Sequence, residues 1–147
     1  MLIVSLDTSS QVSSVAVLSA ERVAAEVSMQ GALTHSETLM PHIELALQMA
    51  RAKKTELDGI AVSIGPGSFT GLRIGLAAAK MMAYALNIPM ICVPTLEALA
   101  CHYAGSVGLR ILPMMDAQKG NVYVQEFRWR PEGEDVRLSE EHPLSIL

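Results

Sequence analysis

The chain has 147 residues, of which half are hydrophobic and 18% are charged, with a mean hydropathy of +0.33. This composition excludes a disordered chain, because disordered segments are poor in apolar residues and rich in charge. The net charge of −4 offers no basic field for phosphates, so unaided nucleic-acid binding is not expected. The cysteines Cys92 and Cys101 form no CxxC pair, which favours a reducing compartment.

The start of the chain lacks the pattern of a signal peptide. Its short apolar run ends at Asp7, and no basic segment precedes it. The longest apolar tract, residues 74–93, contains Lys80, Asn87 and Pro89, and charge near a bilayer centre is costly. We therefore expect a cytoplasmic chain with no membrane span, in which this tract forms a buried helix and a strand.

Three runs rich in Val, Ile and Leu open the chain, at residues 2–7, 13–18 and 22–28. Their close spacing predicts an antiparallel meander. Thr34 and Glu37 then have the spacing of a capping box, and apolar residues follow at helical period, which predicts an amphipathic helix. Pro41 inside this helix is expected to kink it or to mark its true start.

The middle of the chain predicts a strand at residues 59–65, a helix at 71–86 and a strand at 90–93. A strand, helix and strand in this order predict a parallel pair. Thr95 is expected to cap a shorter helix that ends near Gly105.

A hairpin is predicted next, formed by residues 110–116 and 121–129 around a turn at Gln118–Lys119–Gly120. We interpret this hairpin as the start of a second sheet. Residues 130–141 are polar and charged, and the final PLSIL is too short to complete another unit.

The stretch GPGSFTGLRIG, from Gly65 to Gly75, is the most informative motif. Its glycines and hydroxyls, placed between a strand and a helix, aim backbone amides as a phosphate site requires. It is not a Walker A loop, because Leu72 and Arg73 stand where Lys and Ser or Thr are needed. The alternative is that the glycines only allow a tight turn and close helix packing.

A second motif, DTSS, follows the first strand. It places a carboxylate and three hydroxyls at a strand end, where a phosphate or its metal would be met, although an ordinary Asp/Ser turn is the favoured explanation. The weak candidates for nucleotide binding in both motifs are Asp7, Thr8, Ser9, Gly65, Gly67 and Ser68.

Catalytic and metal sites find little support in the sequence. His35 and His42 are separated by about 10.5 Å along a helix, too far to share one zinc ion. No GxSxG elbow is present, and no Ser/His/Asp arrangement can be assembled. We therefore expect no catalytic residues and no metal ligands.

Small residues recur every four positions along the helix at 71–86, namely Gly71, Gly75, Ala79 and Ala83. This gives one smooth helix face, which suits either a partner helix or the helix's own sheet. The apolar residues of the earlier helix leave the same two alternatives open.

The motifs DTSS, THSETLMP and GPGSFTGLRIG, together with PTLEAL and MDAQKGNVY, resemble the bacterial TsaB (YeaZ) family, from Leu2 to about Phe127. The resemblance implies the α/β fold of the actin-like ATPase (ASKHA, ribonuclease H-like) superfamily. Residues 1–105 would form a complete first lobe and residues 106–147 the start of a second. Because family chains continue further, we expect a fragment or a truncated chain.

The resemblance also implies a function. Members are non-catalytic subunits that pair with TsaD, which, with TsaE and ATP, transfers a threonylcarbamoyl group to the adenosine 3′ to the anticodon in tRNA. The chain alone would bind no cofactor, ATP and a metal ion would serve the TsaD-containing complex, and tRNA would be met only through that complex.

Two departures from the catalytic relative favour this division of labour. Its HxxxH metal pair corresponds here to residues 95–99, TLEAL, and Thr8 follows Asp7 where the superfamily's phosphate motif has glycine. The alternative is a glycopeptidase-like or ATP-hydrolysing enzyme of the same superfamily.

In this family the first two helices form the dimer surface, either with TsaD or with a second copy. Transferred by position, the predicted interface consists of Leu39, Met40, Ile43 and Leu47 in the first helix and Leu72, Gly75, Ala79 and Met82 in the second.

Overall fold

The computed structural model describes residues 1–30, 35–132 and 135–147. Its contacts divide the chain into two compact units, unit 1 (Met1–Val93) and unit 2 (Pro94–Leu147). This division falls before the lobe boundary predicted at residue 105, because the helix that follows Pro94 shares its core with the second sheet.

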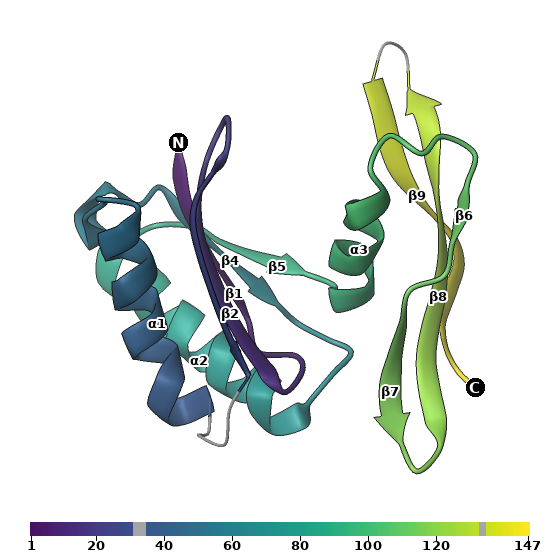
Figure 1. The fold of residues 1–147 in the computed structure, drawn as a ribbon, viewed down its shortest axis with the longest axis horizontal. Helices are drawn as coiled ribbons and strands as arrows, with labels where there is room; N and C mark the ends of the chain where they lie inside the picture. Colours follow the sequence, from purple (N-terminus) through teal and green to yellow (C-terminus); the bar gives the residue numbers. More distant parts are fainter. Residues whose placement is uncertain (31–34, 133–134) are drawn as a thin grey trace. The chain divides into compact units, whose positions relative to one another are not determined.

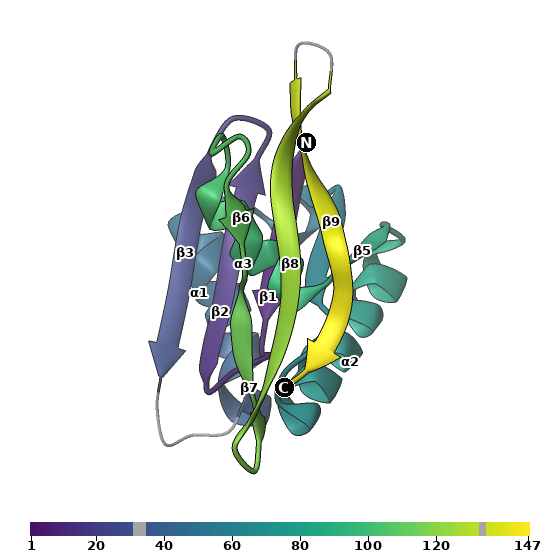
Figure 2. The same cartoon turned by 90° about the vertical axis from the view of Figure 1, so that its right-hand side faces the viewer.

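Unit 1 is a five-stranded sheet in the order β3-β2-β1-β4-β5, with helices α1 and α2 on one face (Figures 1 and 2). The elements are β1 (Leu2–Asp7), β2 (Val12–Ser19), β3 (Val23–Gln30), α1 (His35–Met49), the short 3₁₀ helix η1 (Lys54–Glu56), β4 (Gly59–Ser63), α2 (Phe69–Leu86) and β5 (Met90–Val93). Strands β1 to β3 pair antiparallel, and β4 pairs parallel with β1 and β5. The predicted meander and parallel pair are confirmed.

Alternation along the strands builds the core of unit 1. Val4 and Leu6 on β1 face Val17 and Val15 on β2 in register, and all four are at most 1% exposed. Helices α1 and α2 cover them with apolar side chains such as Ile43. Each such buried side chain contributes about 1.5–3 kcal/mol, so burial holds this unit together.

Both helices of unit 1 form where the sequence predicts them. Helix α1 continues through Pro41, while Thr34 of the predicted capping box lies outside the described residues. Helix α2 begins at Phe69, where the Ser68 hydroxyl accepts a hydrogen bond from the Gly71 N–H. Asn87 ends it in the left-handed conformation, which terminates helices.

Unit 2 is built around one long central strand. Its elements are α3 (Thr95–Ala100), the 3₁₀ helix η2 (Cys101–Tyr103), β6 (Arg110–Ile111), β7 (Met114–Gln118), β8 (Asn121–Glu132) and β9 (Asp135–Ile146). Strands β6 and β7 pair in succession with one edge of β8, and β9 pairs with the other (Figure 2). Leu96 and Ala100 of α3 pack against Ile111 and Phe127 of the sheet.

The hairpin predicted before residue 129 is confirmed as β7 and β8, but the polar segment after it was misjudged. It forms β9, a strand of 12 residues. The hydrogen-bond ladder with β8 fixes this strand, and Arg130 on β8 binds Glu141 on β9 through two hydrogen bonds of 2.9 and 2.7 Å. Charged residues in this segment are paired across strands, so a polar composition is compatible with a strand here.

The cap predicted at Thr95 was wrong. Pro94 occupies the N-cap position, and Thr95 is the first helical residue, 3% exposed. Its Oγ1 is buried and has no hydrogen-bond partner among the described residues. Burial of the Thr95 side chain in unit 2 therefore overrides its preference for a capping position.

The apolar tract at residues 74–93 contributes to α2 and β5, as predicted. In the described part of the chain, every helix is too short or too polar to cross a membrane.

Candidate functional site

The structure brings together the two loops that the sequence analysis singled out. The turn between β1 and β2 packs against the glycine-rich loop that leads into α2. The Thr8 hydroxyl donates a hydrogen bond of 2.8 Å to the Gly71 carbonyl, and the Ser68 N–H donates one of 2.6 Å to the Ser9 carbonyl. Thr8 and Ser9 are only 1% and 2% exposed, so this contact lies inside the protein.

Glycine is required at two positions of this contact. A Cβ on Gly67 would overlap the Ser9 carbonyl oxygen, and a Cβ on Gly75 would overlap Thr8 Oγ1. The sequence left two roles open for these glycines, a phosphate site or close packing. The structure shows that they allow close packing between the β1–β2 turn and α2.

The polar groups placed to meet a phosphate are hydrogen-bonded to one another. The Ser68 N–H and the Gly71 N–H, at the start of α2, are held by the Ser9 carbonyl and by the Ser68 hydroxyl. Asp7 Oδ1 accepts a hydrogen bond of 2.8 Å from the Ser9 N–H. An anion at this helix start would compete with contacts that the chain already makes.

A second buried polar contact joins α1 to the same end of the sheet. Ser13 Oγ on β2 lies 3.1 Å from His42 Nδ1 on α1. The two residues are 2% and 5% exposed. The sequence suggested His42 only as a metal ligand, and its pairing with Ser13 could not be predicted because residues 29 positions apart carry no local signal of contact.

The structure corrects the helix faces assigned to the predicted interface. Six of its eight residues lie in the core of unit 1, and only Met40 and Leu72 have substantial exposure; the six are Leu39, Ile43, Leu47, Gly75, Ala79 and Met82. The apolar periodicity that selected them marks the face on the sheet, because a helix seated on a sheet buries its most regular apolar stripe.

The outer faces of α1 and α2 carry a different set of apolar side chains. On α1 these are Met40, Leu45 and Met49, with exposed fractions of 39%, 44% and 57%, and on α2 they are Phe69, Met81 and Tyr84, with 72%, 69% and 90%. The two helices pack against each other on the same face of the sheet (Figure 1). We call these six residues the outer helix face. Except for Met40, sequence analysis missed them.

Phe69 is the most unusual member of this face. A phenylalanine that is 72% exposed leaves a large apolar surface in water. The Arg73 guanidinium lies 4.7 Å from the centre of its ring, within the range of a cation–π contact.

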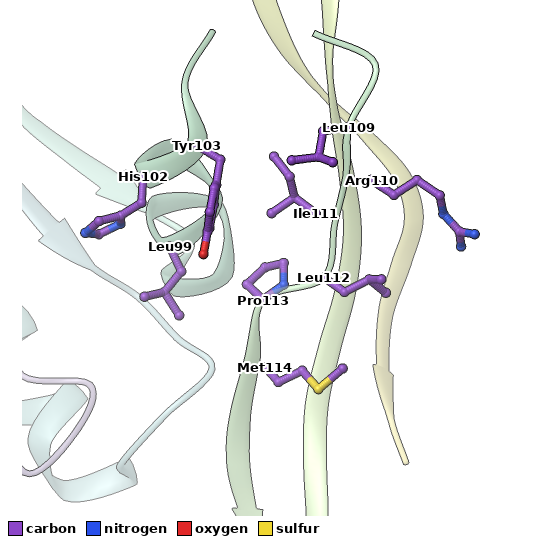
Figure 3. Close-up of a pocket in the computed structure, with 9 residues that line it drawn as sticks. All are labelled: Leu99, His102, Tyr103, Leu109, Arg110, Ile111, Leu112, Pro113 and Met114. Atoms are coloured by element: carbon purple, nitrogen blue, oxygen red, sulfur yellow. The ribbon is translucent and has the colours of Figure 1, made fainter. Parts of the chain in front are cut away.

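Unit 2 contains an open hollow of about 510 Å³ between η2 and the β6–β7 edge (Figure 3). Its lining is mostly apolar and includes Leu99, Tyr103, Leu109, Leu112 and Met114. Figure 3 shows the Tyr103 ring directed at Ile111 and Pro113, while Arg110 points away.

Arg110 instead binds the carboxylate of Glu126, through hydrogen bonds of 2.7 and 2.8 Å. Glu126 is 5% exposed, and Arg128 and His142 lie 3.7 and 3.8 Å from its oxygens. The hydrogen bonds from Arg110 hold the pKa of Glu126 below its usual range, although burial opposes them. This carboxylate thus ties β6, β8 and β9 together.

Within residues 1–30, 35–132 and 135–147, no three or more His, Cys, Asp or Glu side chains are grouped as a metal ion would need.

Comparisons with known proteins agree on one family. The model of the family described as TsaD, tRNA N6-adenosine threonylcarbamoyltransferase, matches residues 27–141. The tRNA threonylcarbamoyladenosine biosynthesis protein TsaB of Bacillus subtilis (strain 168) is 36% identical over 130 residues, covering 88% of this chain and 56% of the relative. Its namesake in Escherichia coli (strain K12) is 32% identical over 129 residues, covering 87% and 55%.

Among solved structures, YeaZ from Pseudomonas aeruginosa superposes with a TM-score of 0.84 at 28% identity, over 99% of this chain and 67% of that one. The chain spans about half the length of the curated relatives it matches.

Proposed function

The chain belongs to the TsaB (YeaZ) family and also matches the TsaD family model, and from this premise we propose that it serves threonylcarbamoyladenosine synthesis on tRNA as a non-catalytic partner of TsaD. The same similarity confirms the predicted actin-like α/β fold. TsaD, with TsaE and ATP, would perform the transfer, and this chain would support it by binding.

The outer helix face carries this proposal. Apolar side chains that are exposed as neighbours on one helix, rather than singly, mark surfaces for protein contact. Met81 and Tyr84 are 69% and 90% exposed on adjacent turns of α2. Methionine adapts its shape to a partner, and tyrosine is enriched among the residues that dominate binding energy. We propose that TsaD, or a second copy of this chain, docks here.

The buried contact between the β1–β2 turn and the glycine loop supports a non-catalytic role. The Ser9 carbonyl occupies the Ser68 N–H, one of the amides that a phosphate would need. Residues 95–99, where the catalytic relative is expected to carry its metal pair, contain no histidine. With no histidine pair at residues 95–99 and with the Ser68 and Gly71 amides already hydrogen-bonded within the chain, charge developing on a phosphate or carbamoyl oxygen would find fewer stabilising groups there.

The deciding experiment is a reconstitution in which one component is left out at a time. Labelled threonine is followed into tRNA with TsaD, TsaE, a threonylcarbamoyl-adenylate synthase and ATP, with and without this chain. We expect label only when the chain is present, and no ATP hydrolysis by the chain alone. The longer Bacillus subtilis relative serves as the positive control. If that relative supports labelling and this chain does not, residues 1–147 do not suffice as the partner.

A surface variant then tests where the partner binds. The double substitution Met81→Ser with Tyr84→Ser removes two exposed apolar contacts and is expected to weaken TsaD binding by about tenfold or more. Val23→Ser is the matched control, because Val23 is also an exposed apolar residue (55%) but belongs to β3 and to neither helix. Equal binding by the double variant and the control would remove the outer helix face from the proposal.

The enzyme alternative makes the opposite prediction for nucleotide. An ATP-hydrolysing protein binds ATP by itself and loses that binding in Asp7→Ala. Isothermal titration of the chain with ATP and Mg²⁺ separates the two, and we expect no binding.

A further inference from the structure

From the buried contacts at one end of the sheet of unit 1, we infer that the β1–β2 turn is a positioning clamp for α1 and α2. The clamp residues are Thr8, Ser9 and Ser13. Its importance for partner binding rests on the proposed function, whereas its effect on the two helices does not.

The clamp holds α2 through Thr8 and Ser9. The Thr8 hydroxyl reaches the Gly71 carbonyl in the first turn of the helix, and the Ser9 carbonyl accepts the N–H of its cap, Ser68. Gly67 and Gly75 let the turn approach this closely, since a Cβ at either position would overlap the clamp. The beginning of α2 is therefore fixed by directed contacts in addition to apolar packing.

The clamp holds α1 through Ser13. This residue follows the turn at the start of β2, and its hydroxyl contacts His42 in the middle of α1. Ser13 and the two turn residues thus connect both helices to one short segment of chain. Each helix is therefore held by a hydrogen bond to this segment as well as by its packing on the sheet.

Burial of these polar groups explains why they position rather than merely stabilise. Apolar packing is not directional, so two helices on a flat apolar sheet retain freedom to slide and rotate. Hydrogen bonds require a definite distance and angle, and inside a protein an unmade one is costly. Thr8, Ser9 and Ser13 are at most 2% exposed, and their hydrogen bonds admit a narrow range of helix placements.

The position of the clamp gives it a consequence for recognition. The outer helix face is shared between α1 and α2, so its shape depends on how these helices lie against each other. A partner that contacts both helices binds best when their arrangement is already fixed, because ordering them on binding reduces affinity. The two motifs weighed above as weak candidates for nucleotide binding thus support the outer helix face.

The first test measures the helices directly, without a partner. Spin labels on Gln48→Cys and Lys80→Cys report the distance between α1 and α2, in a background where the exposed Cys92 and Cys101 are changed to serine. Thr8→Val keeps the shape of the side chain and removes the hydroxyl, whereas Thr8→Ser keeps the hydroxyl. We expect the distance distribution to broaden in Thr8→Val and in Ser13→Ala, and to remain narrow in Thr8→Ser. An unchanged distribution in Thr8→Val and Ser13→Ala overturns the clamp.

The second test measures TsaD binding by the same variants without labels, at a temperature where melting curves show each one folded. We expect Thr8→Val to bind about three- to tenfold more weakly, in line with one lost hydrogen bond, and Thr8→Ser to restore the affinity. Equal affinity for all variants overturns the role in recognition. Failure of the wild-type chain to bind TsaD overturns the proposed function, while the spin-label distances still decide on the clamp.

Discussion

Unit 1 and unit 2 are each stabilised internally by different interactions. In unit 1, two helices and a sheet enclose a continuous apolar core, and buried polar side chains such as Thr8 and Ser13 are hydrogen-bonded. In unit 2, the core cluster formed by the described residues has four buried apolar members, and much of the sheet is joined by backbone pairing and by ion pairs such as Arg110–Glu126. Burial therefore organises unit 1, whereas strand pairing and charge organise unit 2.

The largest loss of stability is expected from a substitution in the small apolar core of unit 2. Phe127 is 3% exposed and is the largest side chain of its small core. Phe127→Ala is expected to cost about 3–5 kcal/mol, the range for deleting a buried aromatic ring. Hydrogen exchange followed by residue should then lose protection in β8 and β9 while β1 and β4 keep theirs. Equal loss in both units would show that they unfold together.

Unit 1 should respond to a matched pair of substitutions on one helix. Ile43 is fully buried and Leu45, two residues further along α1, is 44% exposed. Ile43→Ala is expected to lower the free energy of unfolding by about 2–5 kcal/mol through lost burial and a cavity, whereas Leu45→Ala should change it by less than about 0.5 kcal/mol. Urea denaturation measures both. A larger loss for Leu45→Ala than for Ile43→Ala would show that the buried face of α1 is assigned incorrectly.

The contrast between Ile43 and Leu45 also shows which features of the fold can be predicted from the sequence and which cannot. Alternating valines and leucines identified β1 and β2, and the glycine motif located α2, because local period and turn chemistry decide such elements. The same period selected Ile43 as an interface residue, although it is buried in the core. Periodicity tells that a helix has an apolar face, but what covers that face is decided by the tertiary structure.

The segment after residue 129 illustrates a second limit. Its polar, charged composition gave no prediction of a further strand, yet Arg130 and Glu141 meet across β8 and β9. When the side chains of a strand are paired with those of a neighbouring strand, its own composition does not identify it as a strand. The contact between Thr8 and Gly71 was equally hidden, because the two residues are 63 positions apart.

A smaller and pH-dependent effect should distinguish the charged unit from the apolar one. Because the pKa of Glu126 is lower in the folded chain than in the unfolded chain, the stabilisation is complete above the unfolded pKa of about 4.3 and is lost as the pH falls through the folded pKa. Glu126→Gln should therefore flatten the acid dependence of unit 2 stability below about pH 4.3. Glu140→Gln, which changes an exposed carboxylate on β9, is the control and should keep the wild-type slope.

The smallest effect is expected at an exposed ion pair of unit 1. Lys54 and Glu44 approach to 3.0 Å, but their side chains are 47% and 63% exposed. Water and salt screen such pairs, and ordering two long side chains opposes the attraction, so Lys54→Ala should change the free energy of unfolding by less than about 0.5 kcal/mol. Urea denaturation at low and high salt measures it. A larger, salt-sensitive loss would mean that charge also organises unit 1, and the contrast between the units would then be one of degree.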